Sequence, residues 1–150
     1  MEKNSSRFRD QNLRLADFDQ KVAVHCPSCQ RKAWATVDYT HAKAKLVCPF
    51  CGFFKTVSTS IWLYGKRIPM QGPAHVYFQA KLWYFTSFRD DVFWALNDEH
   101  LNYLEKYIAA KQRQSNERTH FTLLERLPKF YHDAKNRESL LKLIQKLKKK

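Results

Sequence analysis

The sequence contains four cysteines, which come as two C-x-x-C pairs with 18 residues between them. The first pair lies in the tetrapeptide CPSC at 26–29 and the second in CPFC at 48–51. This spacing falls within the C-x₂-C-x₁₅₋₂₀-C-x₂-C pattern of zinc sites. A tight turn aims both sulfurs of a pair at one point, so two turns supply a tetrahedral shell of thiolates. We therefore predict one structural Zn²⁺ ion with the ligands Cys26, Cys29, Cys48 and Cys51.

A structural role is expected for this metal. A segment of about forty residues buries too little apolar surface to fold alone, whereas zinc binding contributes about 10 kcal/mol to folding. Catalytic zinc keeps an open fourth position, usually with His or carboxylate ligands, whereas four thiolates close the shell. His25 and His41 lie near the cysteines but are expected at the surface or in a hairpin. A redox C-x-x-C motif is the rival interpretation, although it usually occurs singly, before a helix in a βαβ unit.

The chain is strongly basic. It has 27 Lys and Arg residues against 14 Asp and Glu, a formal net charge of +13. That balance favours a polyanionic partner, nucleic acid first and an anionic membrane surface second. The alternative is a basic protein with a solvated lysine surface. In the zinc ribbon that we predict around the two cysteine pairs, aromatic residues are interleaved with the cations. This composition is typical of proteins that bind single-stranded nucleic acid or RNA. An alternative role for these aromatics is to form the thin core of the ribbon, with the lysines offsetting the negative zinc–thiolate centre.

Basic residues in two regions are the predicted nucleic-acid contacts. Alternation over 43–45 puts Lys43 and Lys45 on one face of a strand. The helix predicted at the C-terminus ends in a run of lysines. Such a run favours salt-sensitive contacts with phosphates, and the alternative is a solvated tail. The predicted contacts are Arg31, Lys32, Lys43, Lys45 and Lys55 in the ribbon, and Lys142, Lys146 and Lys148 in the last helix.

The predicted fold class is α+β, with an N-terminal Cys₄ zinc ribbon and a β-hairpin followed by about three C-terminal α-helices. Runs rich in β-forming residues predict the strands of the ribbon and of the hairpin. Apolar residues at helical spacing predict the helices. The strands are expected at 21–25, 32–39, 43–47, 53–59, 82–88 and 92–96, and the helices after a cap at Asn97, over 121–135 with an interruption at Pro128, and after a cap at Asn136.

Four segments follow from this pattern. Glycines and prolines between residues 65 and 73 break up regular structure and indicate a boundary after the ribbon. The predicted segments are a polar N-terminal tail at 1–20, the zinc ribbon at 21–60, a connector at 61–79, and a β-hairpin plus helical region at 80–150.

Several functions are not favoured by the sequence. No apolar run reaches 18 residues, and residues 1–7 lack the apolar core of a signal peptide. We therefore expect a cytoplasmic protein without a membrane partner, in a reducing compartment that favours zinc over disulfides. Because no nucleophile with a nearby base, phosphate loop or catalytic metal spacing appears, we predict that the protein is not an enzyme, and no small-molecule substrate is evident.

The two CPxC knuckles resemble the zinc ribbons of transcription-factor-IIB-type proteins and of many nucleic-acid enzymes. Further segments are similar to a family of small bacterial proteins that contain such a ribbon and whose activity is uncharacterised. These segments are LW at 82–83, FWALNDEHLNYLE at 93–105, LERLPKF at 124–130 and AKNR at 134–137. The resemblance covers roughly residues 22–58 and 82–147. It implies that ribbon and helices form one unit, and it carries over the four cysteines as the site residues but no substrate or catalytic residue.

Together these patterns predict a zinc-binding, non-enzymatic protein that binds DNA or RNA. A role as an accessory factor of transcription, or of another nucleic-acid machinery, would fit this activity. The alternative is a protein–protein adaptor that uses the structural zinc ribbon as a docking module on a larger complex. In that case the positive charge would serve solubility or an acidic protein partner.

Overall fold

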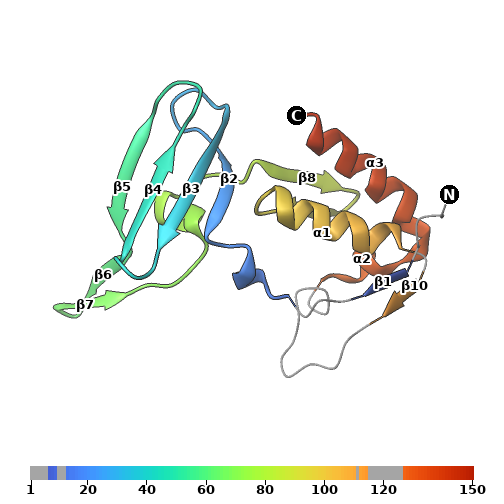
Figure 1. Ribbon diagram of the computed structural model, residues 1–150, viewed down its shortest axis with the longest axis horizontal. Coiled ribbons are helices and arrows are strands. Elements are labelled where there is room, and N and C mark those ends of the chain that lie inside the picture. Colours follow the sequence, from blue (N-terminus) through green and yellow to red (C-terminus); the bar gives the residue numbers. More distant parts are fainter. Residues whose placement is uncertain (1–6, 10–12, 111, 115–126) are drawn as a thin grey trace. The chain divides into compact units, whose positions relative to one another are not determined.

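The computed structural model describes residues 7–9, 13–110, 112–114 and 127–150 (Figure 1). The chain divides into two compact units. The ribbon unit is Ala16–Asp98 and contains both cysteine pairs, and the helical unit combines Met1–Leu15 with Glu99–Lys150. The described part of the chain has an α+β fold with three α-helices, the last at the C-terminus, which confirms the predicted fold class.

The ribbon unit is built on a four-stranded antiparallel sheet in the order β2-β3-β4-β5. Each strand pairs with its neighbour in the sequence, as the alternating apolar and polar residues predict. The first cysteine pair lies between β2 and β3, and the second between β4 and β5. The strands are β2 (Lys21–His25), β3 (Lys32–Asp38), β4 (Lys43–Val47) and β5 (Phe54–Ser58).

One face of this sheet forms the core of the ribbon unit. Its side chains are small or β-branched, and they alternate along the strands with exposed polar residues. The short 3-10 helix η2 (Ala74–Phe78) packs against β2, β3 and β4. The buried side chains of this face include Val22, Val24, Ala33, Ala35 and Leu46, each with an exposed fraction of 0%.

A hairpin of β8 (Tyr84–Phe88) and β9 (Asp91–Ala95) belongs to the ribbon unit. Its bounds agree closely with the predicted strands at 82–88 and 92–96. The chain on either side of it bonds to the free edge of β2. The N–H of Ala23 donates to the carbonyl of Leu96 at 2.7 Å, and the N–H of Trp83 donates to the carbonyl of Ala23 at 2.9 Å. This edge of the sheet is therefore covered, whereas β5 lies at the other edge.

The predicted connector contains a regular element. The strands β6 (Ser60–Leu63) and β7 (Lys66–Pro69) form an antiparallel hairpin directly after β5. Gly65 lies in the turn of this hairpin and Pro69 is the last residue of β7, so these two residues end strands within a regular element that the sequence did not predict.

The helical unit contains α1 (Asp98–Ala109), whose first residue lies at the boundary with the ribbon unit, and α3 (Arg137–Lys148). Between them lie the short helix α2 (Lys129–His132) and the 3-10 turn η4 (Ala134–Asn136). The carboxylate of Glu105 accepts hydrogen bonds from Gln145 and Lys148, each at 2.6 Å, and these tie α1 to α3. The buried residues of α1 are His100, Leu101, Tyr103, Leu104, Tyr107 and Ile108, and those of α3 are Leu140, Ile144 and Leu147.

Some expectations for the ends of the helical unit need revision. Asn136 occupies the N-cap position of α3 but makes no capping hydrogen bond with its side chain, whose amide donates to the carbonyl of Phe130 at 3.2 Å. A parallel pair of short strands, β1 (Arg7–Arg9) and β10 (Gln112–Gln114), was not predicted. The predicted helical residues 121–126 lie outside the described part of the chain. No helix among the described residues is long and apolar enough to cross a membrane.

Candidate metal centre and nucleic-acid interface

The two cysteine pairs lie in backbone turns with the same hydrogen bonds. In the first turn the N–H of Gln30 donates to the carbonyl of Cys26 at 2.9 Å, and in the second the N–H of Gly52 donates to the carbonyl of Cys48 at 3.0 Å. A further bond, from the N–H of the first cysteine to the carbonyl five residues later, closes each turn at 2.8 and 2.9 Å. The chain thus builds one knuckle twice.

The residue after the second cysteine of each knuckle has a left-handed backbone. Gly52 has φ +79° and Gln30 has φ +66°. Glycine adopts this conformation freely, whereas a residue with a Cβ atom pays about 1–2 kcal/mol. Gln30 adopts it nonetheless, so the hydrogen bonds and the sulfur positions of the first knuckle outweigh this strain.

The four sulfurs converge on one point. All four Sγ atoms lie within 4.8 Å of one another. The distance from Cys26 Sγ to Cys51 Sγ is 3.6 Å, and so is that from Cys29 Sγ to Cys48 Sγ. In a tetrahedral site with Zn–S bonds of about 2.3 Å, neighbouring sulfurs lie about 3.8 Å apart. The quartet can therefore bind one metal ion with small movements of the side chains.

Backbone N–H groups support negative charge on the sulfurs. The N–H groups of Ser28 and Cys29 point at Cys26 Sγ, at 3.3 and 3.5 Å. Cys26 and Cys48 are buried, with exposed fractions of 0% and 1%, whereas Cys51 is exposed. Because hydrogen bonds to a thiolate favour the ionised form, the knuckles prepare the sulfurs for a cation.

The thiol pKa values of the metal-free quartet diverge. Desolvation opposes ionisation of Cys48, but the backbone N–H groups of Cys51 and Phe50 outweigh it and lower the pKa of Cys48 to about 7. The backbone N–H of Arg31 favours the thiolate of Cys29, but desolvation and the other three sulfurs outweigh it and raise the pKa of Cys29 to about 11. The Cys29 thiol therefore retains a proton at neutral pH that a metal ion must displace.

The two neighbouring histidines lie apart from the quartet. Within the described residues, the cluster of metal-ligating groups at this point consists of the four cysteines alone. The ring of His25 contacts that of Trp83 at a tilt of 48°, with centroids 4.8 Å apart. His41 lies in the β3–β4 turn, where its Nδ1 is 2.7 Å from a carboxylate oxygen of Asp38.

The sheet face opposite the core carries cations and aromatic rings. We call this surface the open face. Lys21, Thr36, Lys45 and Thr56 are directly paired across all four strands, so their side chains share this face. The neighbouring ladder adds Phe54, which is 62% exposed. The open face comprises Lys21, Ala23, His25, Lys32, Trp34, Thr36, Asp38, Lys43, Lys45, Val47, Phe54, Thr56 and Ser58.

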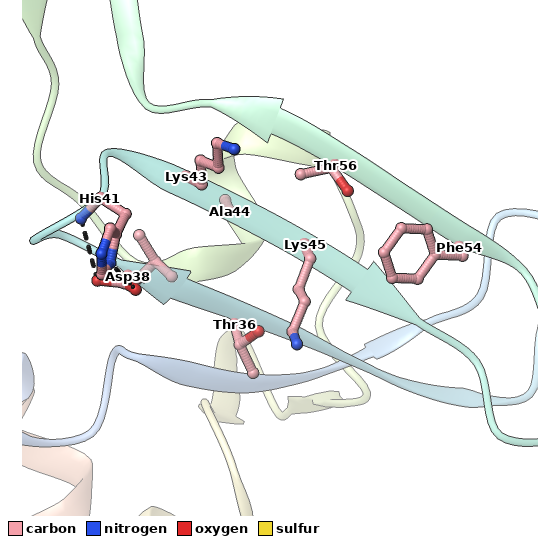
Figure 2. A pocket seen from close by; sticks show the side chains of 9 residues that line it. Thr36, Asp38, His41, Lys43, Ala44, Lys45, Phe54 and Thr56 are labelled. Carbon is pink, nitrogen blue, oxygen red and sulfur yellow. Dashed lines mark hydrogen bonds and ion pairs between the residues drawn. The ribbon is translucent and has the colours of Figure 1, made fainter.

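A shallow depression lies on this face, lined by side chains of β3, β4 and β5 (Figure 2). Lys43 and Lys45 border it, and neither has an ion-pair partner among the residues that the structure describes. The one acid there is Asp38, whose pKa is lowered by its hydrogen bond with His41. Because this carboxylate already bonds the ring and the backbone N–H of His41, the two lysine charges remain available to an anionic ligand.

The other predicted contacts in the ribbon differ from Lys43 and Lys45, because each is either paired with other side chains or lies away from the open face. Lys55 is exposed but pairs with Leu46, so it lies on the opposite side of β5. The ammonium of Lys32 is 2.9 Å from both Asp98 Oδ1 and the Tyr84 hydroxyl. Arg31 lies at the first knuckle, with its guanidinium 5.4 Å from the centre of the Phe50 ring.

The ring of Trp34 is already covered by cations. The ammonium groups of Lys21 and Lys32 lie 4.7 and 4.9 Å from its centroid. Such contacts hold the lysine charges close to the sheet surface. Of the aromatic residues on the open face, Phe54 therefore offers the more accessible ring for stacking.

The predicted contacts of the last helix lie in the helical unit, and two of the three are paired there. Lys148 bonds Glu105 at 2.6 Å, and Lys142 lies 3.4 Å from Glu138. Lys146 is exposed and has no ion-pair partner among the described residues. The sequence alone indicates a uniform basic strip at the C-terminus. It does not reveal the contact of Lys148 with Glu105, because the two residues are 43 positions apart.

Comparison with models of known protein families, with curated proteins and with solved structures gave no match. The geometry of the cysteine quartet and of the open face therefore carries the functional argument.

The left-handed position of the second knuckle yields a stability prediction. Gly52→Ala should destabilise the metal-loaded protein by about 1 kcal/mol, because alanine is strained at φ +79°. The matched control is Gly72→Ala, since neither added Cβ atom meets anything within 4 Å and Gly72 has no such φ. Thermal and urea unfolding of the two variants measures the difference. Equal stabilities would contradict the importance of this backbone conformation.

Metal binding should depend on pH in a defined direction. Zn²⁺ must displace the proton that Cys29 keeps in the metal-free site because of its raised pKa. For each proton displaced, the apparent affinity for Zn²⁺ rises about tenfold per pH unit. Affinity for Zn²⁺ should therefore fall steeply as the pH is lowered from 8 to 6. Competition with a chelator of known affinity measures it at each pH. An affinity that stays constant over this range would argue against thiol ligands.

Proposed function

We propose that this protein is a non-enzymatic nucleic-acid-binding protein in which one zinc ion holds the ribbon in shape. The quartet supports zinc because its ligand atoms are four sulfurs at tetrahedral spacing. Four thiolates around one ion leave no coordination position for a substrate, which supports a structural role. The metal stabilises the sheet, and the open face makes the contacts with the ligand.

One observation carries the nucleic-acid part of this proposal, namely that cations and an exposed aromatic ring lie together on the open face. Lys43 and Lys45 stand side by side on the open face next to the exposed ring of Phe54. The two hydroxyls of Thr36 and Thr56 flank Lys45 on the paired strands. Cations suit phosphates, hydroxyls donate to phosphate or sugar oxygens, and an exposed ring stacks on a base.

Unpaired bases are the ligands that this surface fits best. Among the described residues, the open face is made of β-strands and carries a depression, and it presents no helix that would enter a major groove. Stacking on aromatic side chains requires bases that are accessible from the side, as in single strands and loops. A single-stranded segment of DNA or RNA is therefore the proposed ligand. The resemblance of the knuckles to transcription-factor-type ribbons fits a place in transcription or another nucleic-acid machinery.

A protein–protein adaptor is the second candidate. The observation that favours it is a set of exposed aliphatic side chains on the β6–β7 hairpin, Ile61, Leu63 and Ile68. A pull-down from native lysate with and without nuclease separates the two candidates. Partners that disappear after nuclease treatment support nucleic acid, and partners that persist support the adaptor.

The side of the sheet on which a lysine lies should decide its effect on binding. Lys45→Gln should weaken binding of labelled single strands several-fold and reduce the slope of log K against log salt by about 0.7, because one phosphate contact is lost. Lys55→Gln removes the same charge from the opposite side of the neighbouring strand, so it is the matched control. Fluorescence anisotropy over a range of salt concentrations measures both quantities. If the two variants lose equal affinity, net charge rather than the open face determines binding.

A further inference from the structure

The β6–β7 hairpin ends in a two-residue turn at Tyr64 and Gly65. Both residues have positive φ, 51° and 75°, the combination of a type I′ turn that matches the twist of a hairpin. The hairpin follows β5 directly and belongs to the ribbon unit (Figure 1). The sequence predicts a connector for this segment, without a functional role.

The side chains at the tip of this hairpin are unusually accessible for aromatic residues. Tyr64 is 96% exposed and Trp62 is 68% exposed. The aliphatic residues Ile61, Leu63 and Ile68 are exposed to only 37–45%. Two large aromatic groups in water, at the end of a hairpin, mark a site of contact with another molecule.

The charge of the hairpin indicates the chemistry of that molecule. Trp62 pairs across the strands with Arg67, whose guanidinium lies 5.7 Å from the centre of the indole. Lys66 follows the turn directly and pairs with Leu63. Residues 60–69 contain two cations and no acid. An acidic partner with flat apolar surfaces matches this combination, and single-stranded nucleic acid offers both phosphates and base faces.

The hairpin is anchored at one end of the open face. The N–H of Thr59 donates to the carbonyl of Ala42 at 3.0 Å, and the N–H of Met70 donates to the carbonyl of Thr59 at 2.9 Å. Thr59 is only 4% exposed, so this joint is buried. It lies beside the β3–β4 turn, next to Lys43. An extended path from Phe54 to Tyr64 is about 33 Å long, since each residue of a strand advances about 3.3 Å.

We propose that the β6–β7 hairpin extends the binding site of the open face, with Trp62 and Tyr64 stacking on unpaired bases at one end of the bound strand. Lys66 and Arg67 contact the adjacent phosphates. This inference rests on the proposed nucleic-acid function and adds the position and length of the site.

The test compares oligonucleotides of two lengths, because only the longer strand is expected to reach both the open face and the hairpin. Labelled oligo(dT) and oligo(rU) of about 5 and about 15 nucleotides are titrated with the zinc-loaded full chain by fluorescence anisotropy. Trp62→Ala should weaken binding of the longer strands about tenfold, with little change for the shorter strands that the open face alone can hold. Trp62→Phe should restore most of the affinity. The matched control is Phe85→Ala, which removes a 55% exposed ring from β8 in the same unit.

The outcomes separate this inference from the proposed function. If Lys45→Gln weakens the binding of all strands but Trp62→Ala weakens none, the open face binds nucleic acid and the hairpin does not. If the wild-type chain binds neither length at low salt, both proposals fail. Vesicles with an anionic lipid serve as a further probe, and binding to them that Trp62→Ala abolishes, without an effect on oligonucleotides, would overturn the inference in favour of a membrane. Circular dichroism of each variant verifies that the fold is retained.

Discussion

Four cysteine sulfurs that converge on one point are the constraint on which the proposed zinc ribbon depends. The sulfurs come from two turns, one between β2 and β3 and the other between β4 and β5, so a metal ion at this point would join the two hairpins at one end of the sheet. The core beneath is thin, because Ala33, Ala35 and Ala44 supply much of its surface. Such small side chains bury little apolar area, whereas metal coordination contributes about 10 kcal/mol or more of folding free energy. A metal ion held by the quartet would therefore stabilise a sheet that hydrophobic burial alone would leave marginal.

With the sheet held in this way, the alternation of its strands separates two kinds of surface. The face towards η2 is apolar and buried, and the open face keeps its cations and an exposed phenyl ring in water. Not every lysine is available for a ligand. Lys32 lies between Tyr84 and Asp98, and these contacts raise its pKa against the effect of desolvation. That lysine connects β3 to β8 and to Asp98, whereas Lys43 and Lys45 have no ion-pair partner in the described part of the chain.

The features that could be predicted from the sequence are those set by local spacing. The cysteine pairs, the side shared by Lys43 and Lys45, the β8–β9 hairpin and the apolar stripe of α1 all depend on residues a few positions apart. Contacts between distant residues could not be predicted in this way, as Lys32 and Asp98 are 66 positions apart and β1 pairs with β10 across more than a hundred. The β6–β7 hairpin was missed for a different reason. Gly65 and Pro69 indicate a break in structure, whereas the pairing of β6 with β7 through a turn with positive φ at Tyr64 and Gly65 shows that the chain turns back on itself.

The most direct test of the account is a titration that follows metal content and ligand binding in the same sample. A chelator is added stepwise to the full chain in complex with a labelled single strand, while released zinc, anisotropy and the dispersion of amide NMR signals are recorded. The account predicts about one zinc per chain, and it predicts that zinc release, loss of the sheet signals and loss of binding coincide. A metal-free protein that keeps a folded sheet and binds the strand as tightly as before would contradict it.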